Sequence, residues 1–455
     1  MRFLAYAALV IIGWGSGSGL SAAESKLQVA VFEADVTPPL GTALCDGFVP
    51  PASEIVDRLS ARGIVLIGAG KPIVLCAFDW VGIGNSGYDT FREGLARAAG
   101  TTPDRVALHA LHQHDAPGCD FRADEILTEF GLGNRLFDVG FARIALDRTA
   151  AALTESLRQP QVVTEVGYGK ARVDMVASNR RIVGDDGKVK AIRWSATKDE
   201  AVRAEPEGTI DPFLHLVSFW HEDRPIATLS YYATHPQSHY GLGGVTCDFP
   251  GLARNQRDRE QPGVAHIHFN GAAGNVTAGK YNDGAPENRP VLTARLAEGM
   301  KAAWEATGRM PIQAKDVGWK SVPVSLPPAR FLDMAALRQM VANEGANMMQ
   351  RLRSARQLAW VERCAAGYEL DVSCLSLGNV AVLHLPGELF IEYQLAAQAI
   401  RPEMPTVMAA YADYGPGYIG LQKSYDQGGY ETGEASLVSP EVEGVLMDAL
   451  RKLLK

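Results

Sequence analysis

Residues 107–118, which read ALHALHQHDAPG, place three histidines where an apolar run must stop. Val106–Leu111 is rich in strand-forming residues, and Pro117–Gly118 prevents the strand from continuing. Residues two apart in a strand point to one face, so the spacing predicts that His112 and His114 face the same way. Because α/β proteins place their sites at the carboxyl ends of strands, the pair is a candidate metal or catalytic site. A capped strand end is the alternative, and His109, off that face, is expected to be structural.

Strand and helix signals alternate along the chain, and they predict an α/β protein with mixed β-sheets and surrounding helices. The expected strands are Gly63–Ile67, Ile73–Phe78, Val106–Leu111, Phe213–Trp220, Pro225–Tyr232, Val264–Asn270 and Asn379–Leu385. The expected helices are Tyr88–Ala98, Asp138–Leu157, Pro290–Ala306, Met334–Ala366, Phe390–Ala399 and Pro440–Leu454. Leu326–Ala329, with two prolines, is a weak candidate for a domain boundary.

The first 23 residues predict an export signal, because Arg2 precedes a short apolar stretch, Phe3–Gly13, and the small residues Ser21–Ala23 follow after a Gly/Ser stretch. The protein is therefore expected to be secreted or periplasmic, with a single functional unit over 24–455 and no transmembrane segment after signal removal. The net charge of −8 argues against nucleic acid as a partner. The six cysteines match no zinc-thiolate spacing, and an oxidising compartment permits disulfides whose pairing the sequence leaves open.

Two more histidine motifs follow or lie within expected strands. His235 comes just after Pro225–Tyr232, and Pro236 stops that strand. A metal or catalytic role competes there with a plain polar strand end. His266 and His268 form a second pair two residues apart, and they compete with His112 and His114 for a metal.

The last candidates are a stretch of small residues, a carboxylate and a group of tyrosines. Gly271–Gly279 is too rich in small residues for a helix and would let the backbone approach a ligand, with Thr277 presenting a hydroxyl; a tight turn is the alternative. Glu388 follows a Pro-Gly break directly after a strand, and could instead cap the helix that follows. The region 409–431 predicts a ligand-binding loop, or aromatic packing, from five tyrosines: Tyr411, Tyr414, Tyr418, Tyr425 and Tyr430.

Taken in order, these stretches resemble the N-terminal catalytic domain of the neutral/alkaline non-lysosomal ceramidases, which are secreted zinc amidases. The similar motifs are ADVTPP at 34–39, RLSAR at 58–62, HQHDAPG at 112–118, NR at 179–180, GNVT at 274–277, LPGE at 385–388 and SY at 424–425. The resemblance covers about residues 28–435 and implies the ceramidase fold. The C-terminal immunoglobulin-like domain of that family is not expected here.

By position, the resemblance implies a Zn²⁺ site with four ligands: His112, His235, Glu388 and Tyr425. It also implies that His114 and Arg180 contact the reacting carbonyl and that Thr277 stands where the family has its catalytic serine. Thr277 is left open between nucleophile, proton relay and hydrogen-bond donor. Zinc would make water ionise near neutral pH and would polarise a carbonyl.

The expected function is therefore an exported zinc hydrolase that cleaves an amide bond in an N-acyl or lipid-like small-molecule substrate. One alternative is a zinc esterase or lactonase that uses the same site. Another is a catalytically silent lipid- or carbohydrate-binding relative. The silent alternative is favoured by one position: the family carries a second tyrosine twelve residues after its ligand tyrosine, and counting from Tyr425 this position is Leu437.

Overall fold

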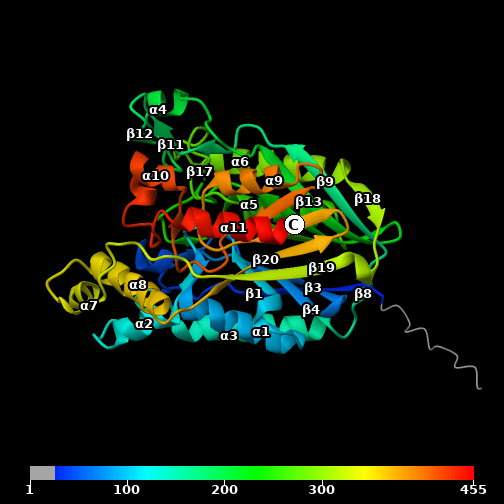
Figure 1. Cartoon of the computed structure of the whole chain (residues 1–455), viewed down its shortest axis with the longest axis horizontal. Helices are drawn as coiled ribbons and strands as arrows, with labels where there is room; N and C mark the ends of the chain where they lie inside the picture. The colour runs from blue at the N-terminus through cyan, green and yellow to red at the C-terminus, as the bar shows by residue number, and fades with distance from the viewer. Residues whose placement is uncertain (1–25) are drawn as a thin grey trace, which may run out of the picture.

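The computed structural model describes residues 26–455, and the expected export signal at 1–23 lies outside these residues. Three large sheets form the centre of the molecule, as Figure 1 shows. The first sheet has the strand order β6 (Val106–Ala110), β4 (Gly70–Phe78), β3 (Ser60–Gly68), β1 (Gln28–Asp35) and β8 (Gln161–Val162). The second has β16 (Ala265–Asn270), β14 (Arg224–Tyr232), β13 (Phe213–His221), β9 (Glu165–Arg172) and β18 (Gly308–Pro311). The third has β19 (Val317–Val324), β20 (Leu370–Leu377), β21 (Val380–His384) and β23 (Thr406–Ala409).

Each sheet turns one face to a core that all three share and the other face to helices. In β4, Ile73 and Leu75 join the shared core, whereas Val74 and Cys76 pack toward the helix side. Both faces of the strand are therefore buried, which explains its nearly continuous apolar run. The alternation has the period of two that a strand imposes.

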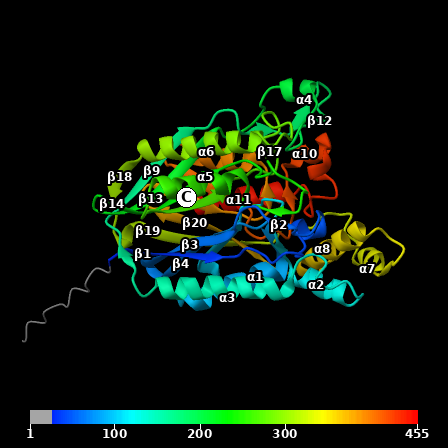
Figure 2. The same ribbon diagram turned by 180° about the vertical axis from the view of Figure 1, so that it is seen from behind.

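Helices cover the outer faces in pairs. The first sheet is covered by α1 (Asn85–Ala99) and α3 (Val139–Ser156), and the second by α5 (Asp248–Glu260) and α6 (Asn288–Glu305). The third is covered by α9 (Ile391–Ile400) and α11 (Val442–Leu454). Figure 2 shows α1 and α3 below the sheets and α6 above them. The expected α/β class, with mixed sheets and surrounding helices, is confirmed.

The remaining α-helices are α2 (Phe121–Thr128), α4 (Glu200–Ala204), α7 (Met334–Ala342), α8 (Met348–Ala365) and α10 (Gln422–Gln427). The short strands are β2 (Glu54–Ile55), β5 (Gly82–Ile83), β7 (Gly118–Cys119), β10 (Ser178–Asn179), β11 (Arg181–Val183), β12 (Val189–Ile192), β15 (Gly244–Val245), β17 (Val276–Thr277), β22 (Glu388–Leu389) and β24 (Tyr418–Ile419).

Two expectations about the chain between 326 and 366 are wrong. The single helix over Met334–Ala366 is two helices, because Asn343 takes an extended conformation after α7 and Asn347 caps α8 by accepting a hydrogen bond from Met349 N at 2.8 Å. Leu326–Ala329 does not separate two units, since β19 before it pairs with β20 after it along eight residues, from Val317↔Leu377 to Val324↔Leu370. All six cysteines are free thiols. Within residues 26–455, no helix has the length and apolar character needed to cross a membrane.

The three sheets share one further property, which decides where a site can form. Each has one parallel strand pair at an edge: β4 with β6, β14 with β16, and β21 with β23. Parallel strands run the same way, so their carboxyl ends lie at the same end of the sheet. Backbone hydrogen bonds join the three sets of ends, from Ala110 N to Tyr411 O at 2.9 Å and from Ala410 N to Asn270 O at 3.0 Å.

A buried carboxylate joins the second sheet to α9. Asp211 Oδ2 accepts hydrogen bonds from Gln394 Nε2 and Gln398 Nε2, both at 2.8 Å, and Oδ1 accepts from Phe213 N at 3.1 Å. Burial acts to raise the pKa of Asp211, but hydrogen bonds from His215 and the two glutamines outweigh burial and lower it to about 2.

We predict that Asp211 makes the fold acid-sensitive. Its folded pKa of about 2 lies below the ordinary 3.8, so its contribution is present above pH 3.8 and is lost as the pH falls toward 2. A shift of this size corresponds to roughly 2 kcal/mol. Asp211→Asn should lower the free energy of unfolding at pH 7 and flatten its decline between pH 4 and 2 in urea titrations. Asp223→Asn, at a side chain that is 97% exposed, is the control; equal slopes for wild type and Asp211→Asn would contradict the prediction.

Candidate functional site

Two histidines and a glutamate meet where the strand ends of the three sheets come together. His112 follows β6, His235 follows β14, and Glu388 lies four residues after β21. Their ligand atoms lie within 4.8 Å of one another, and within residues 26–455 this is the one such group of three or more His, Cys, Asp or Glu. All three are buried, with 1–2% of their surface exposed. The structure thus brings together three of the four metal ligands that the resemblance implies.

The orientation of both imidazoles is fixed by backbone carbonyls. His112 Nδ1 lies 2.6 Å from Val81 O, and His235 Nδ1 lies 2.6 Å from Ala273 O. A carbonyl only accepts, so each Nδ1 carries the proton and each Nε2 presents a lone pair. These two Nε2 atoms lie 3.2 and 3.0 Å from Glu388 Oε2. Two lone pairs that face an ionised oxygen repel it, and a cation among them removes the conflict.

Burial favours the neutral imidazole at His235 and at His114. Burial lowers the pKa of His235 to about 4, and burial together with the charges of His112 and His235 lowers that of His114 well below its ordinary value. Metal ligands must be neutral imidazole and ionised carboxylate, so the donor set fits a cation such as Zn²⁺.

The strand spacing from which we expected His112 and His114 to face the same way is the wrong reason, although the two rings do lie close together. Strand β6 ends at Ala110, and His112 has a positive φ of 75°, so neither histidine is in a strand. The ring centroids are 4.7 Å apart, and that of His114 is 6.0 Å from that of His235. His114 Nδ1 is buried without a hydrogen-bond partner. The left-handed residue, and not a pleat, turns the two rings toward one centre.

The structure does not bring Tyr425 to this cluster. Tyr425 lies on α10, and its hydroxyl is 3.0 Å from Ser436 Oγ. The tyrosine whose hydroxyl reaches His235 is Tyr418, because β22 pairs with β24 in the register Glu388↔Tyr418. Its hydroxyl lies 3.4 Å from His235 Nε2, and its ring stacks on that of His235 at an interplanar angle of 11°.

Counting from Tyr418 instead of Tyr425 also changes what Leu437 implies. Counted from Tyr418, the position twelve residues further on is Tyr430, and the two hydroxyls are 2.7 Å apart. Leu437 is a buried core residue whose carbonyl accepts a hydrogen bond from Trp360 Nε1 at 2.8 Å. Its aliphatic side chain therefore carries no argument for a silent protein.

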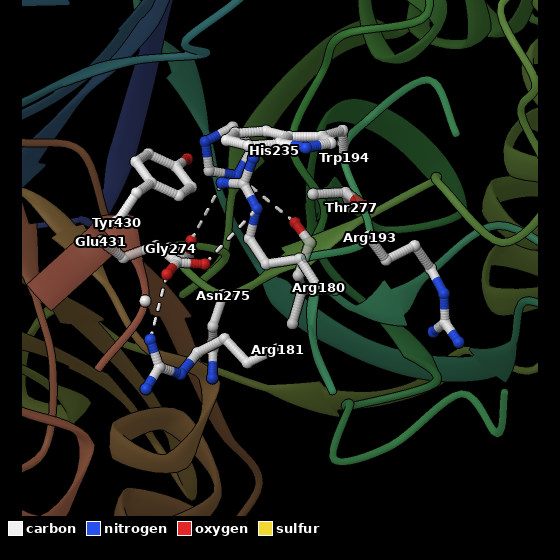
Figure 3. Close-up of polar contacts among 12 residues, drawn as sticks. Arg180, Arg181, Arg193, Trp194, His235, Gly274, Asn275, Thr277, Tyr430 and Glu431 are labelled. Carbon is white, nitrogen blue, oxygen red and sulfur yellow. Dashed lines mark hydrogen bonds and ion pairs between the residues drawn. The ribbon is translucent and has the colours of Figure 1, made fainter. Parts of the chain in front are cut away.

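Arg180 places a fixed positive charge beside both tyrosines. Its Nη1 donates to Tyr418 Oη at 3.2 Å and to Gly274 O at 3.3 Å, and its Nε lies 3.7 Å from Glu431 Oε1. Its guanidinium carbon is 5.1 Å from the Tyr430 ring centroid. Burial acts to lower the pKa of Arg180, but Tyr430, Tyr418 and Glu431 outweigh burial and raise it. Figure 3 shows Arg180 directed toward Tyr430 and Glu431, while the guanidinium of Arg193 points away from it.

Thr277 is near the site but fully buried. It pairs with Ser178 between β17 and β10, which places it close to Arg180 in the neighbouring turn, as Figure 3 shows. Its Oγ1 accepts a hydrogen bond from Gly279 N at 3.0 Å, within its own turn. The preceding residue, Val276, accepts a hydrogen bond from His235 N at 3.0 Å, so this turn supports a candidate ligand.

The competing histidines lie elsewhere and have other partners. His266 Nδ1 is 2.9 Å from Thr228 Oγ1, and His268 Nδ1 is 2.9 Å from Ser230 Oγ, both within the second sheet. His109 Nδ1 lies 2.7 Å from Ala410 O and its Nε2 lies 3.0 Å from His384 Nδ1. His109 therefore connects the first and third sheets below the cluster.

A pocket of about 880 Å³ opens onto the cluster. Its polar floor includes His114, Arg180, Glu388, Tyr418 and Tyr430, and Tyr414 also lines it. Apolar and aromatic side chains form much of the remaining wall: Phe48, Trp194, Tyr240, Met349 and Leu437. The arrangement can hold a cation and a polar reacting group at the floor, with an apolar chain extending along the wall.

The comparisons with known proteins agree with this fold. No protein-family model matches the chain, and no curated protein matches its sequence. Among solved structures, it is similar to the neutral ceramidase from Pseudomonas aeruginosa, with a TM-score of 0.67, 15% sequence identity, and coverage of 94% of this chain and 74% of that one. A ceramidase complexed with C2 matches with the same TM-score and identity and 75% of its chain covered. The chain thus has the ceramidase fold.

We predict that the purified protein binds about one divalent metal per chain through this cluster. His235→Ala should lose that metal, because it removes one of two facing Nε2 lone pairs. Elemental analysis after dialysis measures the content. His268→Ala, a buried histidine of the same sheet outside the cluster, is the matched control and should retain the metal. Metal loss in His268→Ala with retention in His235→Ala would place the site elsewhere.

Proposed function

We propose that the protein is a zinc-dependent hydrolase that cleaves an amide bond in an N-acyl, lipid-like substrate, and that it acts after export, in the periplasm or outside the cell. The observation that carries the proposal is the pair of Nε2 lone pairs that face a buried carboxylate at the floor of a large, partly apolar pocket. Such a donor set, next to an open space, is typical of a catalytic rather than a closed structural metal site.

His112, His235 and Glu388 would hold the metal, and Tyr418 replaces Tyr425 as the proposed fourth ligand. Nitrogen and oxygen donors in this number suit zinc. When bound, zinc supplies a Lewis acid that polarises the scissile carbonyl and lets water ionise near neutral pH. Tyr418 is supported by its register with Glu388. Burial raises the pKa of its hydroxyl well above the usual value, and Arg180, which donates to that hydroxyl, acts to lower it.

The remaining polar groups would stabilise the developing charge or transfer protons. Arg180 and the Tyr430 hydroxyl line the pocket on one side, where they would stabilise negative charge that develops on the carbonyl oxygen. His114, neutral and with an unpartnered Nδ1, would accept the proton that the attacking water gives up and pass it to the departing amine. Thr277 is proposed to act through its hydroxyl, as nucleophile, relay or donor, from the turn that also accepts His235 N.

The substrate class follows from the pocket wall and from the leaving group. Phe48, Trp194, Tyr240 and Met349 offer apolar surface to a long chain. An amine must receive a proton to depart from a tetrahedral intermediate, whereas an alkoxide departs more readily without one. The placement of His114 beside the cluster therefore favours an amide over an ester or lactone.

We expect the metal-loaded protein to hydrolyse long-chain N-acyl amides in a panel of matched amides, esters and lactones. His114→Ala should retain its metal and lose about 10²–10³ in kcat on amides, with a smaller loss on esters, because the proton for the amine is removed. Product release and metal content are measured together. Hydrolysis of esters or lactones alone would establish the esterase alternative, and no turnover by metal-loaded protein would establish a silent relative.

Two tyrosines offer a matched test of the fourth ligand. Tyr418→Phe should weaken metal binding by about tenfold or more, because it removes an oxygen beside the cluster. Tyr425→Phe should leave metal binding unchanged, since its hydroxyl contacts Ser436. Competition with a chromogenic chelator measures both affinities. Weaker binding in Tyr425→Phe alone would restore Tyr425 as the ligand.

A further inference from the structure

A second pocket, of about 850 Å³, lies at the end of the molecule opposite the site. It is lined by the β3–β4 turn at 68–70, by His221 where β13 turns into β14, and by Val317 at the start of β19. Strands β4 and β14 begin there and run toward the site, so the nine residues of β14 separate the two pockets by roughly 30 Å. In Figure 1, β8 and β18 mark this end on the right, whereas β17 and α10 lie on the left.

The walls of this pocket continue the core that the three sheets share. Leu27, Val163, Ile312 and Val317 line it, and each belongs to that shared core with at most 9% of its surface exposed. One wall comes from each sheet or from the segment next to it, so the pocket is the open end of the inter-sheet core. An apolar chain placed here would continue the packing of the core instead of lying on a flat surface.

The titratable side chains that line the pocket are all basic. Lys26, His221 and Lys315 line it, and no Asp or Glu is among its lining residues within 26–455, although the chain has 52 acidic against 44 basic side chains. His221 Nδ1 is buried without a hydrogen-bond partner. Apolar walls with a basic rim are complementary to a ligand that has one anionic head and a long apolar tail.

We propose that this pocket binds a single-chain lipid carboxylate, a long-chain fatty acid, with its chain in the inter-sheet core and its head between Lys26, Lys315 and His221. The site is separate from the proposed catalytic centre and does not depend on the proposed function. The fatty acid is either the acid that amide hydrolysis would release or one supplied by other lipids. In either case its binding at the far end would not block the catalytic pocket.

Binding of hexadecanoate below its micelle concentration, measured by calorimetry on full-length protein in the His235→Ala background, tests the proposal. Ala69→Trp fills the far pocket, and Ala435→Trp fills the catalytic pocket; both residues line their pockets. We expect Ala69→Trp to abolish one binding event that Ala435→Trp leaves intact. Lys26→Glu should weaken this event about tenfold, since it replaces attraction by repulsion, while Lys71→Glu, outside the lining, should leave it unchanged. Thermal unfolding checks that each variant is folded.

Two further binding experiments test the role of the carboxylate and the source of the fatty acid. Hexadecanol, with the same chain and no charge, should bind at least about tenfold more weakly. Supplying an N-hexadecanoyl amide instead of hexadecanoate should give binding in wild type but not in His235→Ala if the source is the protein's own product. Three results would each overturn the proposal. The first is equal binding of hexadecanol, and the second is loss of the binding event only in Ala435→Trp. The third is binding by a chain that starts at residue 26 but not by the full chain. The last result would make residues 1–25 the occupant.

Discussion

The rest of the structure depends on one buried carboxylate. Glu388 is 2% exposed, and an ionised group taken out of water costs several kcal/mol unless a positive charge compensates it. Its closest partners are the Nε2 atoms of two histidines whose protons are directed to backbone carbonyls on the other side of each ring. The protein alone does not supply the missing positive charge at this point. The proposed cation would supply it, and the fold brings the three donors to one place.

This convergence is set by how the sheets end. Each ligand comes from a different sheet, so no single supersecondary unit could form the site. The ends are fixed to one another by Ala110 N to Tyr411 O and Ala410 N to Asn270 O, and Asn270 Nδ2 donates to Leu111 O at 3.3 Å. His112 and Tyr411, whose rings stack at 4.6 Å, both have positive φ. Unfavourable backbone conformations in bulky residues persist where the surroundings hold them, and they gather at functional sites.

Much of the candidate site could be predicted from the sequence, because the signals for its strand ends are local. Apolar runs that stop at histidines or at Pro-Gly located the strand ends before His112, His235 and Glu388, and the order of motifs indicated the ceramidase fold. The tyrosine was not predictable in the same way, because five tyrosines share the region 409–431 and only a two-residue bridge, Glu388↔Tyr418, selects one. A spacing of twelve residues between two tyrosines was the available signal, and Tyr418 with Tyr430 is the pair that satisfies it. The break between α7 and α8 could not be predicted from the sequence either. Only the backbone conformations of Asn343 and Asn347 show that these residues end α7 and cap α8.

The direction of the strands gives the molecule two unlike ends. At the carboxyl ends of the parallel pairs, polar loops carry histidines and tyrosines, because loops beyond a strand are free to take left-handed turns that aim a side chain inward. At the opposite end the same strands begin with short turns, such as Gly68–Gly70, that contribute few polar side chains. The inter-sheet core is therefore closed by polar groups at the catalytic end and left open between apolar walls at the other. Chemistry at one end and an apolar pocket at the other follow from the same arrangement of strands.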